Sequence, residues 1–207
     1  MLNTMQKYLY SVLFIVVLVL IRLSVPADPL EAAKWLPDHW LTVSLALQLV
    51  PFAGIAFLWF IAVLCDRMSV YEDHFFTTVF VGSGLLFLAM LFACSAVAGA
   101  MVMVYGASPD TFIKSGIYTF GRALTYKIMN VYAMKMAGVF MIATSTASIR
   151  TGIIPRWMTL LGYGLALLLL IGLEYFHWMP LVFPLWVLLI SVHILFANLG
   201  PKPVSDL

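Results

Sequence analysis

The chain has 207 residues, of which 64% are hydrophobic and 10% are charged, and its formal net charge is +2. A soluble domain carries about 25% charged residues and must cover its outside with polar groups, so this composition excludes an ordinary water-soluble fold. The net charge is too small to suggest a nucleic-acid partner, and no nucleic-acid-binding motif appears in the sequence.

Lipid requires every backbone polar group to find an internal partner, which leaves helices or closed barrels as spanning structures. Barrel strands alternate apolar and polar residues, whereas residues 13–21 form an unbroken apolar run. The sequence therefore predicts an all-α integral membrane protein.

Six stretches are apolar enough, and near enough to the required length of about 20 residues, to cross a bilayer. They lie near residues 8–25, 41–65, 76–104, 128–149, 157–176 and 179–198. We therefore expect a single transmembrane domain over residues 1–207, folded as a bundle of six transmembrane helices. The first stretch follows Lys7 like a signal peptide, but Arg22 interrupts it and the cleavage pattern is poor, so we expect a retained helix.

The connection Gly106–Lys127 alternates apolar and basic residues. Ser108 and Asp110 are typical of a helix start, and the pattern that follows predicts an amphipathic segment on the bilayer surface, before the chain turns into the fourth span. Its basic residues Arg122 and Lys127 are candidate contacts for anions or lipid head groups.

The distribution of basic residues predicts the orientation in the membrane, because short cytoplasmic loops are enriched in Lys and Arg. Arg150 and Arg156 flank the very short turn between the fourth and fifth spans. We therefore expect both termini in the cytoplasm and Gly106–Lys127 on the opposite side.

Polar residues inside the expected spans are candidates for a membrane site, because a charge at the bilayer centre costs about 2.5–3.5 kcal/mol on insertion scales. Lys135 lies about 10 Å below the outer surface, where it either snorkels or contacts a ligand or ion. Glu174 belongs to the same leaflet and is its candidate ion-pair partner. Gln48 marks a polar spot in the second span, and His193 is either a hydrogen-bonding strut or a proton relay in the last.

No pattern predicts a catalytic residue, a cofactor or a metal ion. Glu174 and His177 have the Glu-x-x-His spacing of di-iron bundles, but the motif occurs once and no second glutamate falls in an expected span. Cys65 and Cys94 are expected to be packed thiols. Phosphate-binding loops, zinc-binding helices and nucleophile elbows are absent from the sequence, so an enzyme is not favoured.

Small residues are frequent in the third, fourth and fifth expected spans, and they allow helix backbones to approach closely. One interpretation is a tight core built from these three helices. The other makes the hydroxyl run Thr144–Ser148 a polar pathway, and both interpretations stay open at this point.

One further pattern covers residues 121–163. Its parts are Gly121-Arg122, Val131–Ala137, Ser145-Thr146, the turn Arg150-Thr151-Gly152-Ile153-Ile154-Pro155-Arg156-Trp157, and Leu161-Gly162-Tyr163. This stretch resembles uncharacterised bacterial multi-pass inner-membrane proteins. The resemblance implies a location in the bacterial inner membrane and no particular activity.

These observations favour a non-enzymatic partner, scaffold or accessory subunit in the membrane, because the packing pattern is stronger than any site pattern. A small transporter or channel with a polar cavity near Lys135, Gln48 and His193 is the alternative. An intramembrane enzyme acting on lipid or quinone is the second alternative. The expected partners are membrane lipids and either a membrane protein or a second copy of the chain.

Overall fold

The computed structural model describes residues 36–68, 74–114, 116–151, 154–171 and 179–199, and every regular element in these ranges is a helix. Three helical stretches are long and apolar enough to cross a membrane, namely Asp38–Cys65, Thr77–Ala107 and Ile117–Arg150. Two further apolar helices are shorter. The expectation of an all-α protein with helices suited to a membrane is thus confirmed, while the expected span 8–25 lies outside the described residues.

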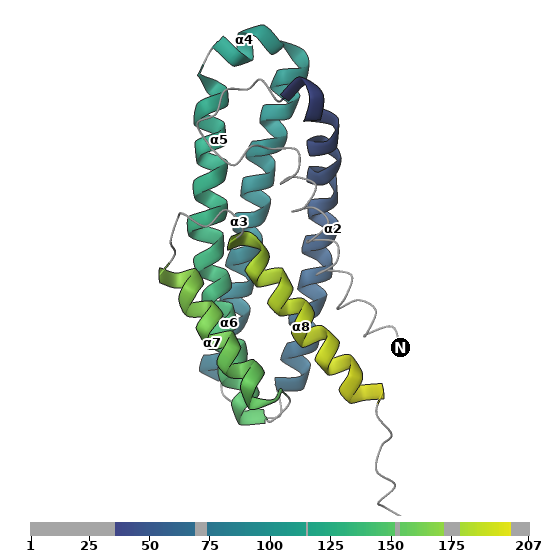
Figure 1. Cartoon of the computed structure of the whole chain (residues 1–207), viewed down its shortest axis with the longest axis vertical. Coiled ribbons are helices and arrows are strands. Elements are labelled where there is room, and N and C mark those ends of the chain that lie inside the picture. The colour runs from purple at the N-terminus through teal and green to yellow at the C-terminus, as the bar shows by residue number, and fades with distance from the viewer. Residues whose placement is uncertain (1–35, 69–73, 115, 152–153, 172–178, 200–207) are drawn as a thin grey trace, which may run out of the picture.

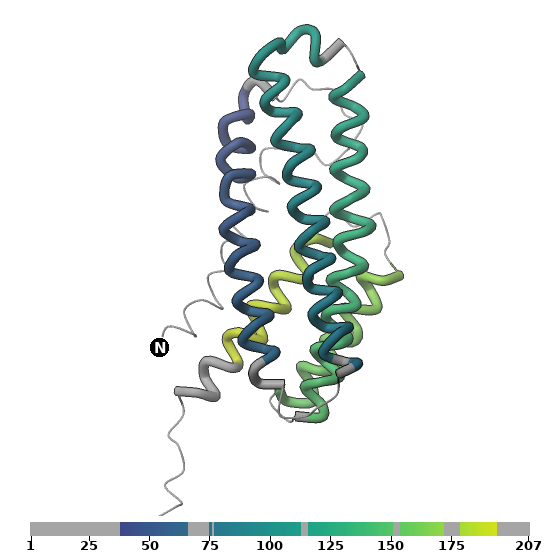
Figure 2. The backbone as a smooth tube through the Cα atoms, turned by 180° about the vertical axis from the view of Figure 1, so that it is seen from behind, coloured from purple at the N-terminus to yellow at the C-terminus, as the bar shows by residue number. Residues whose placement is uncertain are grey.

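The three stretches long enough to cross a membrane run antiparallel to one another in chain order, and the last helix lies at an angle to them (Figures 1 and 2). The described helices are α2 (Leu36–Met68), α3 (His74–Ala107), α4 (Pro109–Lys114), α5 (Ile117–Lys127), the π-helix η2 (Ile128–Ala133), α6 (Met134–Thr151), α7 (Arg156–Ile171) and α8 (Met179–Leu199). The long helix α3 packs against α2, α5, η2 and α6, and α7 and α8 pack against α6. The short helix α4 closes one end of the bundle, opposite the turn between α6 and α7 (Figure 1).

Helices α5, η2 and α6 form one continuous rod from Ile117 to Thr151. The expected turn between a surface segment and the fourth span is therefore wrong, because Lys127 and Ile128 both have right-handed helical backbone angles. The rod is about 50 Å long at 1.5 Å per residue. Helix α5 stays in line with α6 because it packs along α3, burying Tyr118 and Arg122 in the process.

Side-chain donors occupy backbone carbonyl groups in the turn that precedes η2. Asn130 Nδ2 donates to the Tyr126 carbonyl at 3.1 Å, and Thr125 Oγ1 donates to the Gly121 carbonyl at 2.8 Å. Cys94 Sγ of α3 donates to the Thr125 carbonyl at 3.5 Å. Such bonds compete with the regular helical ladder, which favours the local change from α-helical to π-helical pairing in η2.

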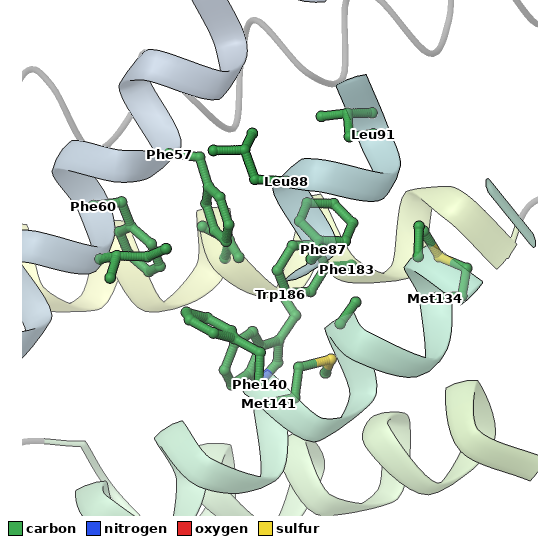
Figure 3. Packing of buried hydrophobic residues seen from close by; sticks show 14 of the residues in the cluster. Phe57, Phe60, Phe87, Leu88, Leu91, Met134, Phe140, Met141, Phe183 and Trp186 are labelled. Atoms are coloured by element: carbon green, nitrogen blue, oxygen red, sulfur yellow. The ribbon is translucent and has the colours of Figure 1, made fainter. Parts of the chain in front are cut away.

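The centre of the bundle is filled by phenylalanine rings from four helices. They are Phe57 and Phe60 of α2, Phe80 and Phe87 of α3, Phe140 of α6 and Phe183 of α8, all fully buried. The ring centroid of Phe57 lies 5.4–6.1 Å from those of four others, and the Phe80 and Phe140 centroids are 4.6 Å apart. Figure 3 shows rings from α2, α3, α6 and α8 turned toward one another. Each such pair contributes about 0.5–1.5 kcal/mol beyond its buried area.

Candidate functional site

Most hydroxyls of the run Thr144–Ser148 bond within α6 or to the neighbouring helix. Thr144 Oγ1 and Ser148 Oγ each donate at 2.7 Å to the carbonyl four residues earlier in α6. Thr146 Oγ1 lies 2.8 Å from Tyr163 Oη of α7, with which it shares a hydrogen bond. Hydroxyls of this kind bond to their own helix and to a neighbour in lipid-embedded bundles, so the geometry favours the packing interpretation over a polar pathway.

Ser145 is the exception within this run. Its Oγ and the Nε1 of Trp186 in α8 are buried and have no hydrogen-bond partner among the described residues. Both atoms converge on Gly162 of α7, where an added Cβ would lie 2.4 Å from Ser145 Oγ and 3.0 Å from Trp186 Nε1. A buried polar group without a partner costs about 1–3 kcal/mol. We call Ser145, Gly162 and Trp186 the polar junction, and it joins α6, α7 and α8.

The sequence patterns did not single out this junction, although Ser145 and Gly162 belong to segments rich in small residues. The three residues are 17 or more positions apart along the chain, and only the antiparallel register of α6 and α7 brings them together. The one signal available in advance was a tryptophan, a donor-only indole, within a run that is otherwise apolar.

The candidate residues for a membrane cavity do not line the described core. Gln48 of α2 and Lys135 of α6 are exposed on the outside of the bundle, and His193 of α8 is half-buried. Glu174 lies outside the described residues, so its pairing with Lys135 stays a prediction. Within the described part of the chain, Lys135 makes no hydrogen bond or ion pair.

The two basic residues expected on one exposed surface face different environments. Lys127 is exposed, whereas Arg122 is buried, its side chain being only 7% accessible. Arg122 Nη1 donates to Tyr118 Oη at 2.5 Å, and its guanidinium carbon lies 5.8 Å from the centre of the Tyr118 ring. Tyr118 in turn packs with Tyr105 and Phe112 in a small aromatic cluster near α4. The spacing of four residues between Tyr118 and Arg122 is the sequence signal that could have predicted this contact. Head-group contact by either basic residue stays a prediction.

Three polar residues mark the outside of the rod at the π-helix. Lys127, Tyr132 and Lys135 are all exposed, Tyr132 to 58%. The i→i+5 pairing of a π-helix places residues five apart, such as Lys127 and Tyr132, on the same side of the rod. The step of three residues to Lys135 keeps to that side. We call these three residues the basic stripe. An unbroken α-helix would turn Lys127 and Tyr132 to different sides.

No group of three or more His, Cys, Asp or Glu side chains within the described ranges is placed to hold a metal ion.

No family model matches the chain, and comparisons with curated proteins and with solved structures found none that is similar. The resemblance of residues 121–163 to bacterial inner-membrane proteins therefore stays a prediction.

Proposed function

We propose that this protein is a non-enzymatic scaffold of the membrane, which holds a partner membrane protein or a second copy of itself. The observation that carries the proposal is the solid phenylalanine core. A transport path needs a polar lining through the bundle, and the described centre contains aromatic rings in close contact. A packed core with no described chemical centre suits a protein that acts through its outer surfaces.

The ends of α6 and α7 support a position for the bilayer. Arg150 ends the apolar part of α6, and Arg156 and the exposed Trp157 open α7, a combination typical of the membrane interface. Counting back about 20 residues from Arg150 reaches Ile128–Asn130 at the other interface. Phe140 then lies near the middle of the hydrocarbon layer. We propose that the chain crosses the bilayer six times when the bilayer is placed in this way, and we call this placement the proposed frame.

In this frame, α2, α3 and α5 extend beyond the hydrocarbon on the side of α4, by about 15 Å for the eleven residues of α5. The extension exposes large apolar side chains from all three helices. They are Leu41 and Leu45 of α2, Met103 and Val104 of α3, and Ile117 and Phe120 of α5. Apolar surface outside the lipid is characteristic of protein interaction sites, which supports a partner at this end.

A photo-crosslinking amino acid at Phe120, which is 70% exposed, tests the proposal in native membranes. We expect a discrete adduct, and an adduct of about twice 23.1 kDa identifies a second copy of the chain. The same partner should co-purify in mild detergent without crosslinking. Leu160 of α7 is equally exposed but lies within the proposed bilayer, so the same substitution there should give no discrete protein adduct. Absence of a discrete adduct at Phe120 contradicts the scaffold.

A small transporter or channel is the second candidate, and the polar junction favours it. Ser145 Oγ and Trp186 Nε1 are buried polar atoms without partners among the described residues, and polar groups inside a membrane are characteristic of functional sites such as solute paths. This candidate requires the bundle to open beside the phenylalanine core.

We further propose a location in the bacterial inner membrane with both termini cytoplasmic and the α4 end outside. Ala107 is exposed and ends α3 next to α4, whereas Arg150 lies in the last turn of α6. In a background with Cys65→Ala and Cys94→Ala, an impermeant thiol reagent applied to whole cells should label Ala107→Cys. Ser205→Cys should react only after the membrane is permeabilised. The reverse pattern overturns this orientation.

A further inference from the structure

We propose that the basic stripe, Lys127, Tyr132 and Lys135, binds the phosphate head group of an anionic phospholipid from the leaflet on the side of α4. The inference rests on the bilayer position proposed above, and it adds a lipid site to a protein proposed to act as a scaffold.

The depths of the three residues relative to the proposed bilayer allow their side chains to reach the head-group region. Lys127 lies one residue beyond Ile128, at the proposed edge of the hydrocarbon, and Lys135 lies about 10–12 Å deeper. The four-carbon stem of a lysine bends toward the interface and keeps its ammonium among polar groups. Both ammonium groups therefore approach the same layer, and the Tyr132 hydroxyl between them is a further donor.

The rod that carries the stripe contains basic residues and no acidic ones. Arg122, Lys127, Lys135 and Arg150 lie between Ile117 and Thr151, without an Asp or Glu, and helix α7 contains no acid either. Lys135 makes no hydrogen bond or ion pair within the described residues. A cluster of basic residues attracts an anion, and each lysine near an anionic surface adds about a factor of five in affinity.

The surroundings of Lys135 favour a lipid over a soluble anion. A Cβ added at Gly138 of α6 would lie 3.0 Å from Leu170 of α7, which places Lys135 level with the end of α7. There Leu167 and Ile171 are exposed apolar side chains. The acyl chain of a phospholipid packs along such residues while the phosphate of the same lipid binds the basic stripe. A free phosphate ion would have to leave water to reach the depth of Lys135.

Titration of the detergent-solubilised protein with phosphatidylglycerol or phosphatidylcholine tests the site, with bound lipid counted by native mass spectrometry. We expect Lys127→Gln and Lys135→Gln each to weaken phosphatidylglycerol binding about fivefold, and the double variant about 25-fold. The matched control is the double variant Lys127→Arg and Lys135→Arg, which keeps both charges and should bind within about twofold of the unmodified protein. Phosphatidylcholine binding should not change in any variant.

Three results overturn the site. Equal phosphatidylglycerol binding by the unmodified protein and the double Gln variant shows that the stripe holds no head group. Protection of the protein against thermal unfolding by inorganic phosphate as strong as that by phosphatidylglycerol shows a site for a soluble anion. A loss of thermal stability for Lys135→Gln that is as large in phosphatidylcholine as in phosphatidylglycerol shows that this lysine acts through a contact within the protein, for example with Glu174, and not through an anionic lipid. The crosslink at Phe120 reports on the scaffold alone, so the two proposals fail independently.

Discussion

Replacing Gly162 by alanine is expected to destabilise the protein by about 1–3 kcal/mol, although alanine is the better helix former. The new Cβ would lie 2.4 Å from Ser145 Oγ and 3.0 Å from Trp186 Nε1. Both of these side chains are only 2% exposed, so neither swings aside without displacing packed neighbours. Helices α6, α7 and α8 must therefore separate at the polar junction. Unfolding in mixed micelles with increasing denaturing detergent, followed by circular dichroism, measures the loss.

Gly164 provides a matched control on the same helix. A Cβ at this position meets no atom within 4 Å, so Gly164→Ala should leave the stability unchanged or raise it by up to about 1 kcal/mol through helix propensity. Adding Ser145→Ala to Gly162→Ala removes the closest atom and should recover part of the loss. Equal effects of the substitutions at Gly162 and Gly164 would show that α6 and α7 do not approach closely at the junction.

The sequence predicted the helical class and the presence of helices apolar enough for a membrane, because a long apolar run has few alternatives in lipid. It failed at α5, where Arg122 and Lys127 lowered the apolar content and suggested a surface segment. In the structure α5 packs along α3, and Arg122 is buried against Tyr118. The direction of α5 therefore depends on its packing against α3, and a local pattern of charged residues does not predict that packing.

The candidate site was less predictable than the fold. Lys127 and Lys135 were identified as separate polar residues, but their alignment depends on the π-helix. Side-chain bonds from Asn130 and from Cys94 of α3 to backbone carbonyls beside the π-helix favour it, and the second of these needs the packing of α3. The polar junction needs the register of three helices. Residue type was enough to identify the lysines as candidates, whereas the grouping of residues in the basic stripe and in the polar junction follows only from the packing of the helices.

Replacing Phe57 by alanine is expected to destabilise the protein by about 2–4 kcal/mol. The Phe57 ring is fully buried, and its centroid lies within 6.1 Å of four other phenylalanine centroids, from α2, α3, α6 and α8. In lipid the transfer of an apolar side chain into the protein contributes little, because the acyl chains are equally apolar. The cost arises instead from the cavity that alanine leaves, because the surrounding rings then face empty space and forfeit their dispersion attraction to Phe57.

Phe52 is the matched control, because it lies on the same helix but is 62% exposed. In a bilayer this ring contacts lipid, which fills the space that an alanine leaves, so Phe52→Ala should cost less than about 1 kcal/mol. The contrast between these two variants separates the two candidate functions. A scaffold with a solid core loses stability at Phe57 and not at Phe52. A transporter whose bundle opens beside these rings already tolerates space at its centre, so it should show a small loss at Phe57 and a change in solute uptake.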